Sequence, residues 1–340
     1  MVVDSSNCTQ RSAITINKRN VEDDGSRSKY KCFLGEFETP LVWKNIILLL
    51  FFHTVAVCYI FIHDYKKYPW TMIYAYFISM IAGFGITAGV HRLWTHRAYK
   101  ANTKLKVILL VLYSMSGMNS VVDWVRDHRV HHKYSDTNAD PHNINRGLFF
   151  SHVGWLCMKK HPDVIKKGRQ IDISDLTDDP LIRFHTKYYG WFKLLFCFVF
   201  PAMIPPLLWG EPWMVSILAN SFVKYVTLLN TTWTVNSLAH YYGNKPYDKN
   251  LKPTQNLFVS LVTKGEGYHN FHHAFPWDYR ASEFLYVFDF TTIVINLFKN
   301  LGWAYDLKTV SPEVLQKTIE RCGDGTHQLN QYSGPTLKSL

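Results

Sequence analysis

Residues 123–143 read DWVRDHRVHHKYSDTNADPHN and hold three closely spaced histidines, His128, His131 and His132. In a helix the first of them lies one turn before the other two, so two or three imidazoles can share one face. Such a face is either a charged, solvated helix surface or part of a metal site. The choice also decides the fold, because a metal site shared with other histidines fixes which segments lie on the same side of a membrane.

The composition indicates a membrane protein with a large polar part. Of the 340 residues, 16% are aromatic and only 19% are charged, whereas the mean hydropathy is close to zero, so much of the chain must also contact water. The net charge of +11 suits a protein that contacts anionic lipid or binds an anionic substrate. No nucleic-acid-binding motif accompanies this charge, so we expect no nucleic-acid partner.

Apolar runs come in two pairs, and each pair is joined by a short link. Residues 46–62 carry no charge, and residues 68–90 follow them after the link HDYKKY. The second pair is 194–210 and 212–239, in which Lys224 is the single charged residue. Each run is long enough to cross a bilayer as a helix. The sequence therefore predicts an all-α fold with four transmembrane helices in two hairpins, at about 44–63, 69–90, 192–210 and 212–240.

The apolar run 107–122 is ambiguous, because it is short and contains Ser, Gly and Asn. If it crossed the membrane, the histidines at 91 and 96 would lie on one side and those at 128–132 on the other. A site built from both sets could not form. We therefore expect 107–122 to be an interfacial or partly buried helix, and we expect the same of the segment 284–298, which Asp289 interrupts.

Lysine and arginine concentrate in residues 11–44, 92–193 and 245–321, which the positive-inside rule assigns to the cytosol. The predicted membrane domain, 41–327, thus carries a cytosolic helical cap made of 91–190 and 241–327. Residues 1–40 and 328–340 are expected to be mobile tails. The first 40 residues contain no apolar signal sequence, so we expect both termini in the cytosol.

Nine of the 16 histidines fall into three motifs and one isolated position. The motifs are HRLWTH at 91–96, HRVHH at 128–132 and HNFHH at 269–273, and His240 stands alone at the end of the fourth span. A single histidine at a helix end is most often a hydrogen-bonded polar residue, but this set on one side of the membrane indicates a metal site. His91 and His96 are five residues apart, which is not a same-face spacing in an α-helix. We infer that the span ends or bends there and directs both rings toward a shared centre.

Nine imidazoles exceed the four ligands of a tetrahedral zinc site, so two metal ions are the natural number. Imidazole suits Fe, Cu, Ni and Zn. Two irons could in addition reduce O2 and oxidise a C–H bond, which zinc cannot do because it has no accessible second oxidation state. Asp127, Asp136, Asp140 and Glu266 lie close enough in the sequence to hydrogen-bond the ligand rings from outside, or they could equally be solvated carboxylates.

The stretches HRLWTH, WVRDHRVHHKYSDTNADPHN and GEGYHNFHHAFPWDY resemble the three histidine boxes of the integral membrane acyl-CoA desaturases. The similarity runs from about residue 43 to 327 and is greatest to insect enzymes of the stearoyl-CoA Δ9 type and to the Δ11 pheromone-forming relatives of moths. It implies that a cis double bond, at Δ9 or Δ11, is introduced into a saturated long-chain acyl-CoA with two iron ions and O2. It also implies an endoplasmic reticulum membrane enzyme with a cytosolic active site. Cytochrome b5 and its NADH-dependent reductase would donate electrons, and because the chain has no HPGG haem motif, the cytochrome must be a separate protein.

The resemblance also assigns site residues by position. The metal ligands would be His91, His96, His128, His131, His132, His240, His269, His272 and His273, with Asn236 binding through a water molecule. The CoA and pantetheine groups would contact Asn45, Asn119, Arg126, Asp127, Lys160 and Trp233. Met118 and Lys159 depart from the family's usual Gln and Arg near the substrate entrance. Ser79 and Ala75 would limit the length of the acyl chain, although small residues also suit close packing of membrane helices.

Three other interpretations use the same histidines. A membrane fatty-acid hydroxylase or sterol oxidase would share the chemistry and differ in its product. A membrane metal transporter or sensor would require ligands at mid-depth, whereas the candidates here gather at span ends. Bis-histidine haem binding would require paired histidines on facing spans, where only His53 and His63 are candidates.

Overall fold

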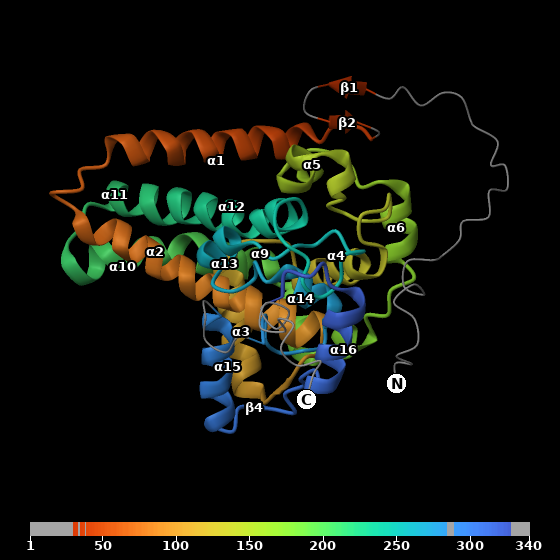
Figure 1. The fold of residues 1–340 in the computed structure, drawn as a ribbon. Coiled ribbons are helices and arrows are strands. Elements are labelled where there is room, and N and C mark those ends of the chain that lie inside the picture. The colour runs from red at the N-terminus through yellow and green to blue at the C-terminus, as the bar shows by residue number, and fades with distance from the viewer. Residues whose placement is uncertain (1–29, 33–34, 38, 284–288, 328–340) are drawn as a thin grey trace.

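A computed structural model describes residues 30–32, 35–37, 39–283 and 289–327 (Figure 1). Most of the two expected tails, 1–40 and 328–340, therefore lies outside the described residues. The described part is mostly helical, as the sequence predicts, and its two small sheets have two strands each. β1 (Tyr30–Cys32) pairs antiparallel with β2 (Gly35–Phe37), and β3 (Lys100–Ala101) pairs antiparallel with β4 (Ala304–Tyr305).

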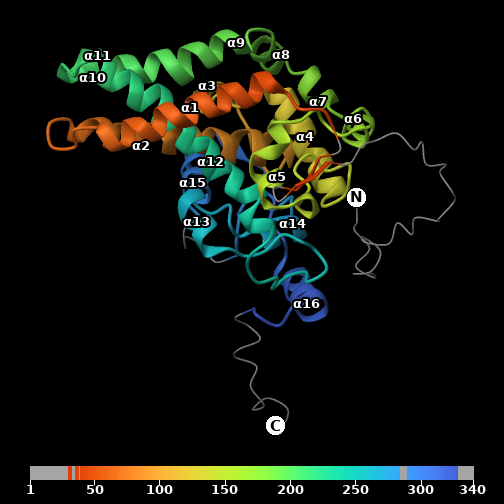
Figure 2. The same ribbon diagram turned by 90° about the horizontal axis from the view of Figure 1, so that it is seen from above.

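Four long helical runs extend to one end of the molecule (Figure 2). The first is α1 (Trp43–Ile62), and the second is α2 (Pro69–Phe84) with its continuation η1 (Gly85–Thr95). The third consists of α9 (Tyr189–Phe192), η4 (Lys193–Val199) and α10 (Phe200–Trp209). The fourth consists of α11 (Trp213–Ile217), η5 (Leu218–Val223) and α12 (Lys224–Asn236). In both views the α1–α2 turn and the α10–α11 turn lie at the same end, away from α6 and α16, as expected for two hairpins.

Three of these helices are long and apolar enough to cross a membrane, namely Trp43–Ile62, Pro69–Thr95 and Tyr189–Trp209. The fourth run is helical throughout but is not among them, because Asn220, Lys224 and Asn230 interrupt its apolar side chains. By length and composition alone, the bent pair α3 (Thr103–Ser116) and α4 (Val121–Tyr134) could also be a broken span. The described residues therefore contain three such helices, or four if the bent pair is one span.

The corner between α3 and α4 is built by capping residues, and the two helices meet at 84°. Asn102 starts α3 by accepting the Leu105 amide at 3.0 Å, and Ser120 starts α4 by accepting the Asp123 amide at 3.3 Å. Between them Gly117 ends α3 in the left-handed conformation, with φ of 67°. The corner turns α4 back against η1, so the run 107–122 forms a packed bend.

The helix that begins as α2 changes to π-helical hydrogen bonding before the first histidine motif. At its end the His96 amide donates to the carbonyl oxygen of His91, five residues earlier, at 3.1 Å. This wider turn brings residues five apart close to one face, and the two ring centroids lie 4.9 Å apart. The rings therefore converge as expected, because the helix ends at Thr95 as a π-helix.

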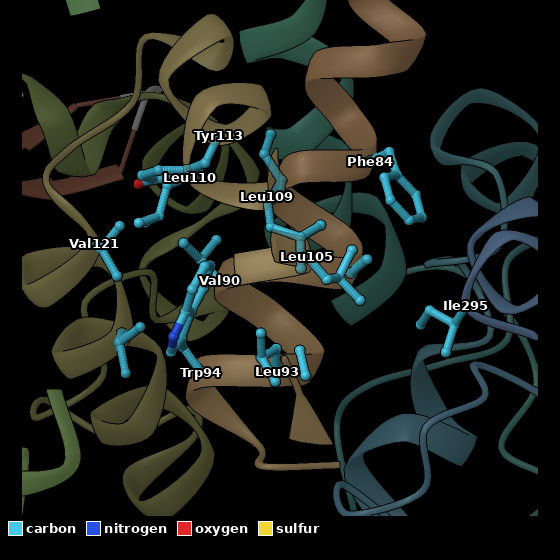
Figure 3. Close-up of a cluster of buried hydrophobic side chains, with 14 of the residues drawn as sticks. Phe84, Val90, Leu93, Trp94, Leu105, Leu109, Leu110, Tyr113, Val121 and Ile295 are labelled. Atoms are coloured by element: carbon cyan, nitrogen blue, oxygen red, sulfur yellow. The ribbon is translucent and has the colours of Figure 1, made fainter. Parts of the chain in front are cut away.

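A buried apolar core joins η1, α3, α4 and α15 (Phe290–Asn300) (Figure 3). Val90 of η1 and Leu109 of α3 are fully buried, and Ile295 of α15 is 1% exposed. The apolar segment expected at 284–298 thus packs on this core through α15, whereas 284–288 lie outside the described residues.

The backbones of η1 and α3 approach closely at one glycine. A Cβ atom at Gly85 would lie 2.3 Å from the Tyr113 nitrogen and 2.4 Å from the Leu112 carbonyl carbon. Small residues at helix interfaces permit such an approach in membrane proteins. This contact determines how closely η1 packs against α3, and η1 carries His91.

Of the other helices, several begin with a proline at the first helical position after a capping residue. The bounds of the other helices are η2 (Ile144–Arg146), α5 (Leu148–His152), η3 (Gly154–Leu156), α6 (Pro162–Gly168), α7 (Ser174–Thr177), α8 (Pro180–Lys187), η6 (Leu238–His240), α13 (Leu257–Thr263), α14 (His269–Ala274) and α16 (Pro312–Cys322).

Replacing Gly85 by alanine should destabilise the protein, because the clashing atoms are backbone atoms that cannot rotate away. We expect a loss of about 1–3 kcal/mol or more in the free energy of unfolding, measured by thermal denaturation of the detergent-solubilised protein. Gly190→Ala is the matched control, because a Cβ there meets no atom within 4 Å. Equal melting temperatures for the two variants would contradict the close packing of η1 on α3.

Candidate metal centre

All nine histidines of the three motifs and position 240 meet in one buried region, where they form two groups. In each group the potential ligand atoms lie within 4.8 Å of one another. We call them the five-histidine group, made of His91, His96, His128, His132 and His272, and the four-histidine group, made of His131, His240, His269 and His273. This arrangement provides two neighbouring positions for metal ions.

Each HxxHH triplet contributes to both groups. On α4 the pair His128 and His132, four residues apart, faces the five-histidine group, and His131 faces the other. On α14 the assignment is reversed, because the pair His269 and His273 belongs to the four-histidine group and His272 to the five-histidine group. Residues four apart on a helix share a face, whereas the intervening residue is turned away from it. Each of the two helices therefore presents histidines to both possible metal positions.

The ring nitrogens point toward common centres. In the five-histidine group the Nε2 atom of His272 lies 3.0 Å from the Nε2 atoms of both His91 and His132. In the four-histidine group the Nε2 atom of His269 lies 3.0 Å from that of His240 and 3.1 Å from that of His273. Nitrogens that bind one ion at about 2.1 Å and at right angles are about 3.0 Å apart. The observed spacing therefore fits ligands of a shared ion.

Two further ring atoms support this fit. Within the described part of the chain, the Nε2 atoms of His96 and His128 are buried and have no hydrogen-bond partner. A buried polar nitrogen without a partner is costly unless something else binds it. A metal ion in the five-histidine group would satisfy both atoms.

Two carboxylates hold the outer nitrogens of ligand rings. Glu266 lies 3.0 Å from Nδ1 of His91, and Asp140 lies 2.9 Å from Nδ1 of His131. A third carboxylate, Asp136, lies 3.5 Å from Nδ1 of His240 but makes no hydrogen bond to it. A carboxylate accepts the Nδ1 proton and so leaves Nε2 free to bind a metal. Asp127, the fourth candidate, instead accepts from Lys160 at 2.5 and 2.6 Å.

Arg92 is a further residue of the site that the sequence analysis does not identify. Its guanidinium is buried and donates to Glu266 at 2.8 Å and to Asp289 at 3.2 Å. It also donates to the Tyr279 carbonyl at 2.8 Å. Arg92 thus fixes the carboxylate that orients His91 and ties it to the N-terminal end of α15. The signal in the sequence is a charged residue inside HRLWTH, directly after an apolar span, where it requires counter-charges.

Burial sets the protonation of most of the ligand rings. Burial, together with repulsion from neighbouring rings, lowers the pKa of six histidines well below the ordinary value. These are His96, His128, His132, His269, His272 and His273. At neutral pH their imidazoles are uncharged and keep a lone pair for a metal ion.

The outer carboxylates stay ionised although they are buried. Burial alone would raise the pKa of Glu266, but Arg92 and His91 outweigh it and lower the pKa to about 2. For Asp140, burial is likewise outweighed by His131 and by its hydrogen bonds, so its pKa lies below the ordinary value. The same ion pair outweighs burial at His131 and raises the pKa of that ring. An ionised carboxylate, that of Asp140, therefore lies beside the four-histidine group.

A cavity of about 600 Å³ runs along the metal centre. Its wall includes His91, His128 and His269, together with Asn236, which stands one turn before His240. Five of the eight predicted substrate residues also line it, namely Asn45, Ser79, Asn119, Asp127 and Trp233. The metal centre and the predicted substrate contacts thus share one cavity.

The other three predicted substrate residues lie outside the cavity wall. Ala75 is buried elsewhere on α2, and Gly83 lines the cavity on that helix together with Ser79. Arg126 donates to Asp123 at 3.2 Å near the surface, and Lys160 is joined to the cavity through its ion pair with Asp127. Ala75, Ser79 and Gly83 are four residues apart and share one face of α2, so the extent of the cavity along the helix axis decides which of them line it, and the sequence does not contain this extent.

The two histidines considered for haem binding have protein partners. Nε2 of His53 accepts a hydrogen bond from the Asn230 side chain at 3.0 Å. His63 contacts the Tyr59 hydroxyl at 2.8 Å and the Tyr68 carbonyl at 3.1 Å. They do not face each other as a bis-histidine site requires.

Comparison with known proteins agrees with this site. The family model for fatty acid desaturases matches residues 68–282. An acyl-CoA Delta-9 desaturase of Acheta domesticus is 46% identical over 294 residues, which cover 86% of this chain and 82% of the relative. An acyl-CoA Delta(11) desaturase of Spodoptera littoralis is 48% identical over 295 residues, covering 86% and 87%.

A human stearoyl-CoA desaturase is 47% identical over 312 residues, covering 91% of this chain and 86% of the relative. The matches extend over all three histidine motifs, His240 and the outer carboxylates. The chain therefore belongs to the fatty acid desaturase family.

Proposed function

We propose that this chain is an O2-dependent acyl-CoA desaturase that introduces a cis double bond into a saturated long-chain acyl-CoA. The observation that carries the proposal is the shared cavity, whose wall holds metal-centre histidines as well as Asn45, Asn119 and Trp233. A flexible alkyl chain in that cavity would pass the histidines while its polar end meets the amide side chains. The relatives named as Delta-9 and Delta(11) desaturases support the same reaction.

Two iron ions are the metals that we propose. Nine imidazoles fit two such ions, and bound iron would supply the oxidising power for a C–H bond, which zinc lacks. The reaction removes one hydrogen from each of two adjacent acyl carbons. O2 takes up these hydrogens, two electrons from the donor chain and two protons, and leaves as two water molecules.

The protein's own residues hold the reacting groups and exclude water. Glu266 and Asp140 keep His91 and His131 in one tautomer and one orientation, and Arg92 locks Glu266. The cavity wall fixes the position of the acyl chain, and a displacement of about 1 Å would change the outcome of such a reaction. We propose Asn236 as a ligand through water, because it lines the cavity beside the four-histidine group.

For substrate recognition we retain Asn45, Asn119, Asp127 and Trp233 as contacts of the CoA and pantetheine groups. Lys160 and Arg126 would meet phosphates at the cavity mouth, since both lie partly exposed beside Asp127 and Asp123. Ser79 and Ala75 would limit the acyl chain, with Ala75 one turn beyond Ser79 on α2, and Gly83 lines the cavity one turn nearer to His91.

We propose the four-span topology for the membrane domain 41–327, with the cap and both termini in the cytosol. The histidines of 91–96 and 128–132 meet in one centre, which favours α3 and α4 as a packed corner over a crossing. The fourth span is then the run from α11 to α12. In this topology the enzyme lies in the endoplasmic reticulum membrane and receives electrons from cytochrome b5 and its NADH-dependent reductase. A role in pheromone-precursor synthesis fits the Delta(11) relative.

Expression in a desaturase-deficient yeast should restore growth without added unsaturated fatty acids. Mass spectrometry of the lipids should show acyl chains lighter by two hydrogens, with one double bond at Δ9 or Δ11. A product heavier by one oxygen would support the hydroxylase alternative and refute the desaturase.

His272→Ala and His131→Ala, one in each group, should each reduce turnover by more than about 100-fold, because each removes a metal ligand. Iron per chain, measured by mass spectrometry of the purified protein, should fall in both. His185→Gln is the control, since His185 is equally buried but contacts Ser114 and lies outside both groups. Retained turnover in either alanine variant would exclude that residue as a ligand.

Asp140→Asn should weaken metal retention by about 10–100-fold, because the amide no longer supplies the charge that holds His131. Iron loss during titration with a chelator would measure the effect. Asp163→Asn, at an exposed position on α6, should leave the chelator curve unchanged. If both curves coincide with that of the wild type, Asp140 has no part in holding the metal.

A further inference from the structure

Trp233 forms part of the cavity wall and is enclosed by two histidines that are not metal ligands. Its side chain is 3% exposed and lies on α12. The ring of His53, from α1, stacks on it with centroids 6.2 Å apart and an angle of 15°. The ring of His152, from α5, meets it edge-on at 5.7 Å and 80°. Residues from three separate segments thus fix one indole.

The hydrogen bonds of His53 define its tautomer. Its Nδ1 atom lies 2.7 Å from the Leu49 carbonyl oxygen, which can only accept, so Nδ1 carries the proton. Nε2 then has a free lone pair, and it accepts from the amide nitrogen of Asn230 at 3.0 Å. The same amide nitrogen donates to the Val226 carbonyl at 2.8 Å. Both protons of the Asn230 amide are therefore used.

The chain of hydrogen bonds continues from Asn230 to His152. The Asn230 carbonyl oxygen can only accept, so Nε2 of His152 donates to it, at 3.3 Å. On its other side, Nδ1 of His152 carries no proton and accepts from the Ser237 hydroxyl at 2.9 Å. The chain therefore begins on α1, crosses to Asn230 of α12 and ends at Ser237, one turn after Trp233.

These polar groups lie inside an otherwise apolar helix bundle. An imidazole or an amide in such surroundings is costly unless a partner satisfies it, and leucine would fill the same space without that requirement. Their mutual hydrogen bonds make one arrangement of α1, α5 and α12 specific. Ser237 ends α12 just before η6, whose last residue is His240. The chain is therefore joined both to the cavity wall and to the turn that carries a metal-centre histidine.

We propose that His53, Asn230 and His152 are positioning residues, which hold Trp233 against the pantetheine end of the substrate and thereby help to determine which acyl carbons face the metal centre. This inference rests on the proposed desaturase function. None of the three residues lines the cavity, so each acts through Trp233. A loosened indole should let the substrate bind more weakly and in more than one register.

The test uses microsomes of desaturase-deficient yeast that contain the full chain, with NADH and stearoyl-CoA. His53→Leu should raise KM about fivefold or more, as expected for the loss of about one hydrogen bond, and kcat should fall by less. A second double-bond isomer should appear in the product. His53→Gln, which keeps an acceptor for Asn230, should return KM to within about twofold of the wild type. The double variant His53→Leu, Asn230→Leu should add little to either single change, because both break the same chain.

His63→Leu is the matched control. His63 is another histidine of the α1 hairpin with two hydrogen bonds, and it is more buried than His53, but it lies away from the cavity. It should leave KM and the isomer ratio unchanged even if it lowers the melting temperature. If His53→Leu does not accumulate, His152→Gln carries the test with the same measurements.

An unchanged KM and a single isomer in the position-53 or position-152 variants would overturn the inference, as would equal effects in His63→Leu. A wild-type preparation that forms no monounsaturated product would instead refute the proposed function, so the two failures are distinguishable.

Discussion

The burial of nine imidazoles, six of them fully and three partly, is the constraint on which the rest of the molecule depends. Burial lowers the pKa of most of these rings, and once one nitrogen faces the centre, the other requires an acceptor. Glu266 and Asp140 supply acceptors for two of the rings. These carboxylates are themselves buried and require hydrogen-bond donors, and the donor for Glu266 is Arg92. The buried guanidinium of Arg92 in turn requires a second counter-charge, which is Asp289 at the start of α15. The requirements of the metal centre thus extend into the apolar core shown in Figure 3.

The same constraint explains the shape of the chain between the first two histidine motifs. The segment leaves the membrane helix at Thr95 and must return with His128 to within reach of His91. A straight apolar helix over 103–134 would carry the second motif away. The left-handed Gly117 and the cap at Ser120 instead produce a corner, and the contact at Gly85 lets α3 lie directly on η1. Local backbone chemistry therefore brings the two motifs together.

Much of this arrangement could be predicted from the sequence. Apolar length predicted helices near 44–63 and 192–210, and the structure has Trp43–Ile62 and Tyr189–Trp209. The convergence of the nine histidines follows from their motifs and from the requirement that they share one side of a membrane. Helix length and histidine spacing are local properties of the chain, so they can be predicted without knowledge of tertiary contacts.

Other features depend on tertiary contacts and could not be predicted. The division into five and four histidines depends on how α4 and α14 are rotated about their axes, and whether Ala75 or Gly83 lines the cavity depends on how far the cavity extends along α2. From the sequence, Asp127 could hydrogen-bond a metal ligand, but its carboxylate instead accepts from Lys160, 33 residues later. The π-helix at Gly85–Thr95 has no compositional signature, because it differs from an α-helix by one residue per turn.

The crossed contribution of the two HxxHH triplets has a thermodynamic consequence. Because α4 and α14 each supply ligands to both groups, an ion in one group immobilises the helices that present ligands to the other. The first ion to bind loses the conformational entropy of ordering these helices. The second ion binds to helices that are already ordered, so its binding is more favourable. Metal loading should then be cooperative, with few half-loaded molecules at equilibrium.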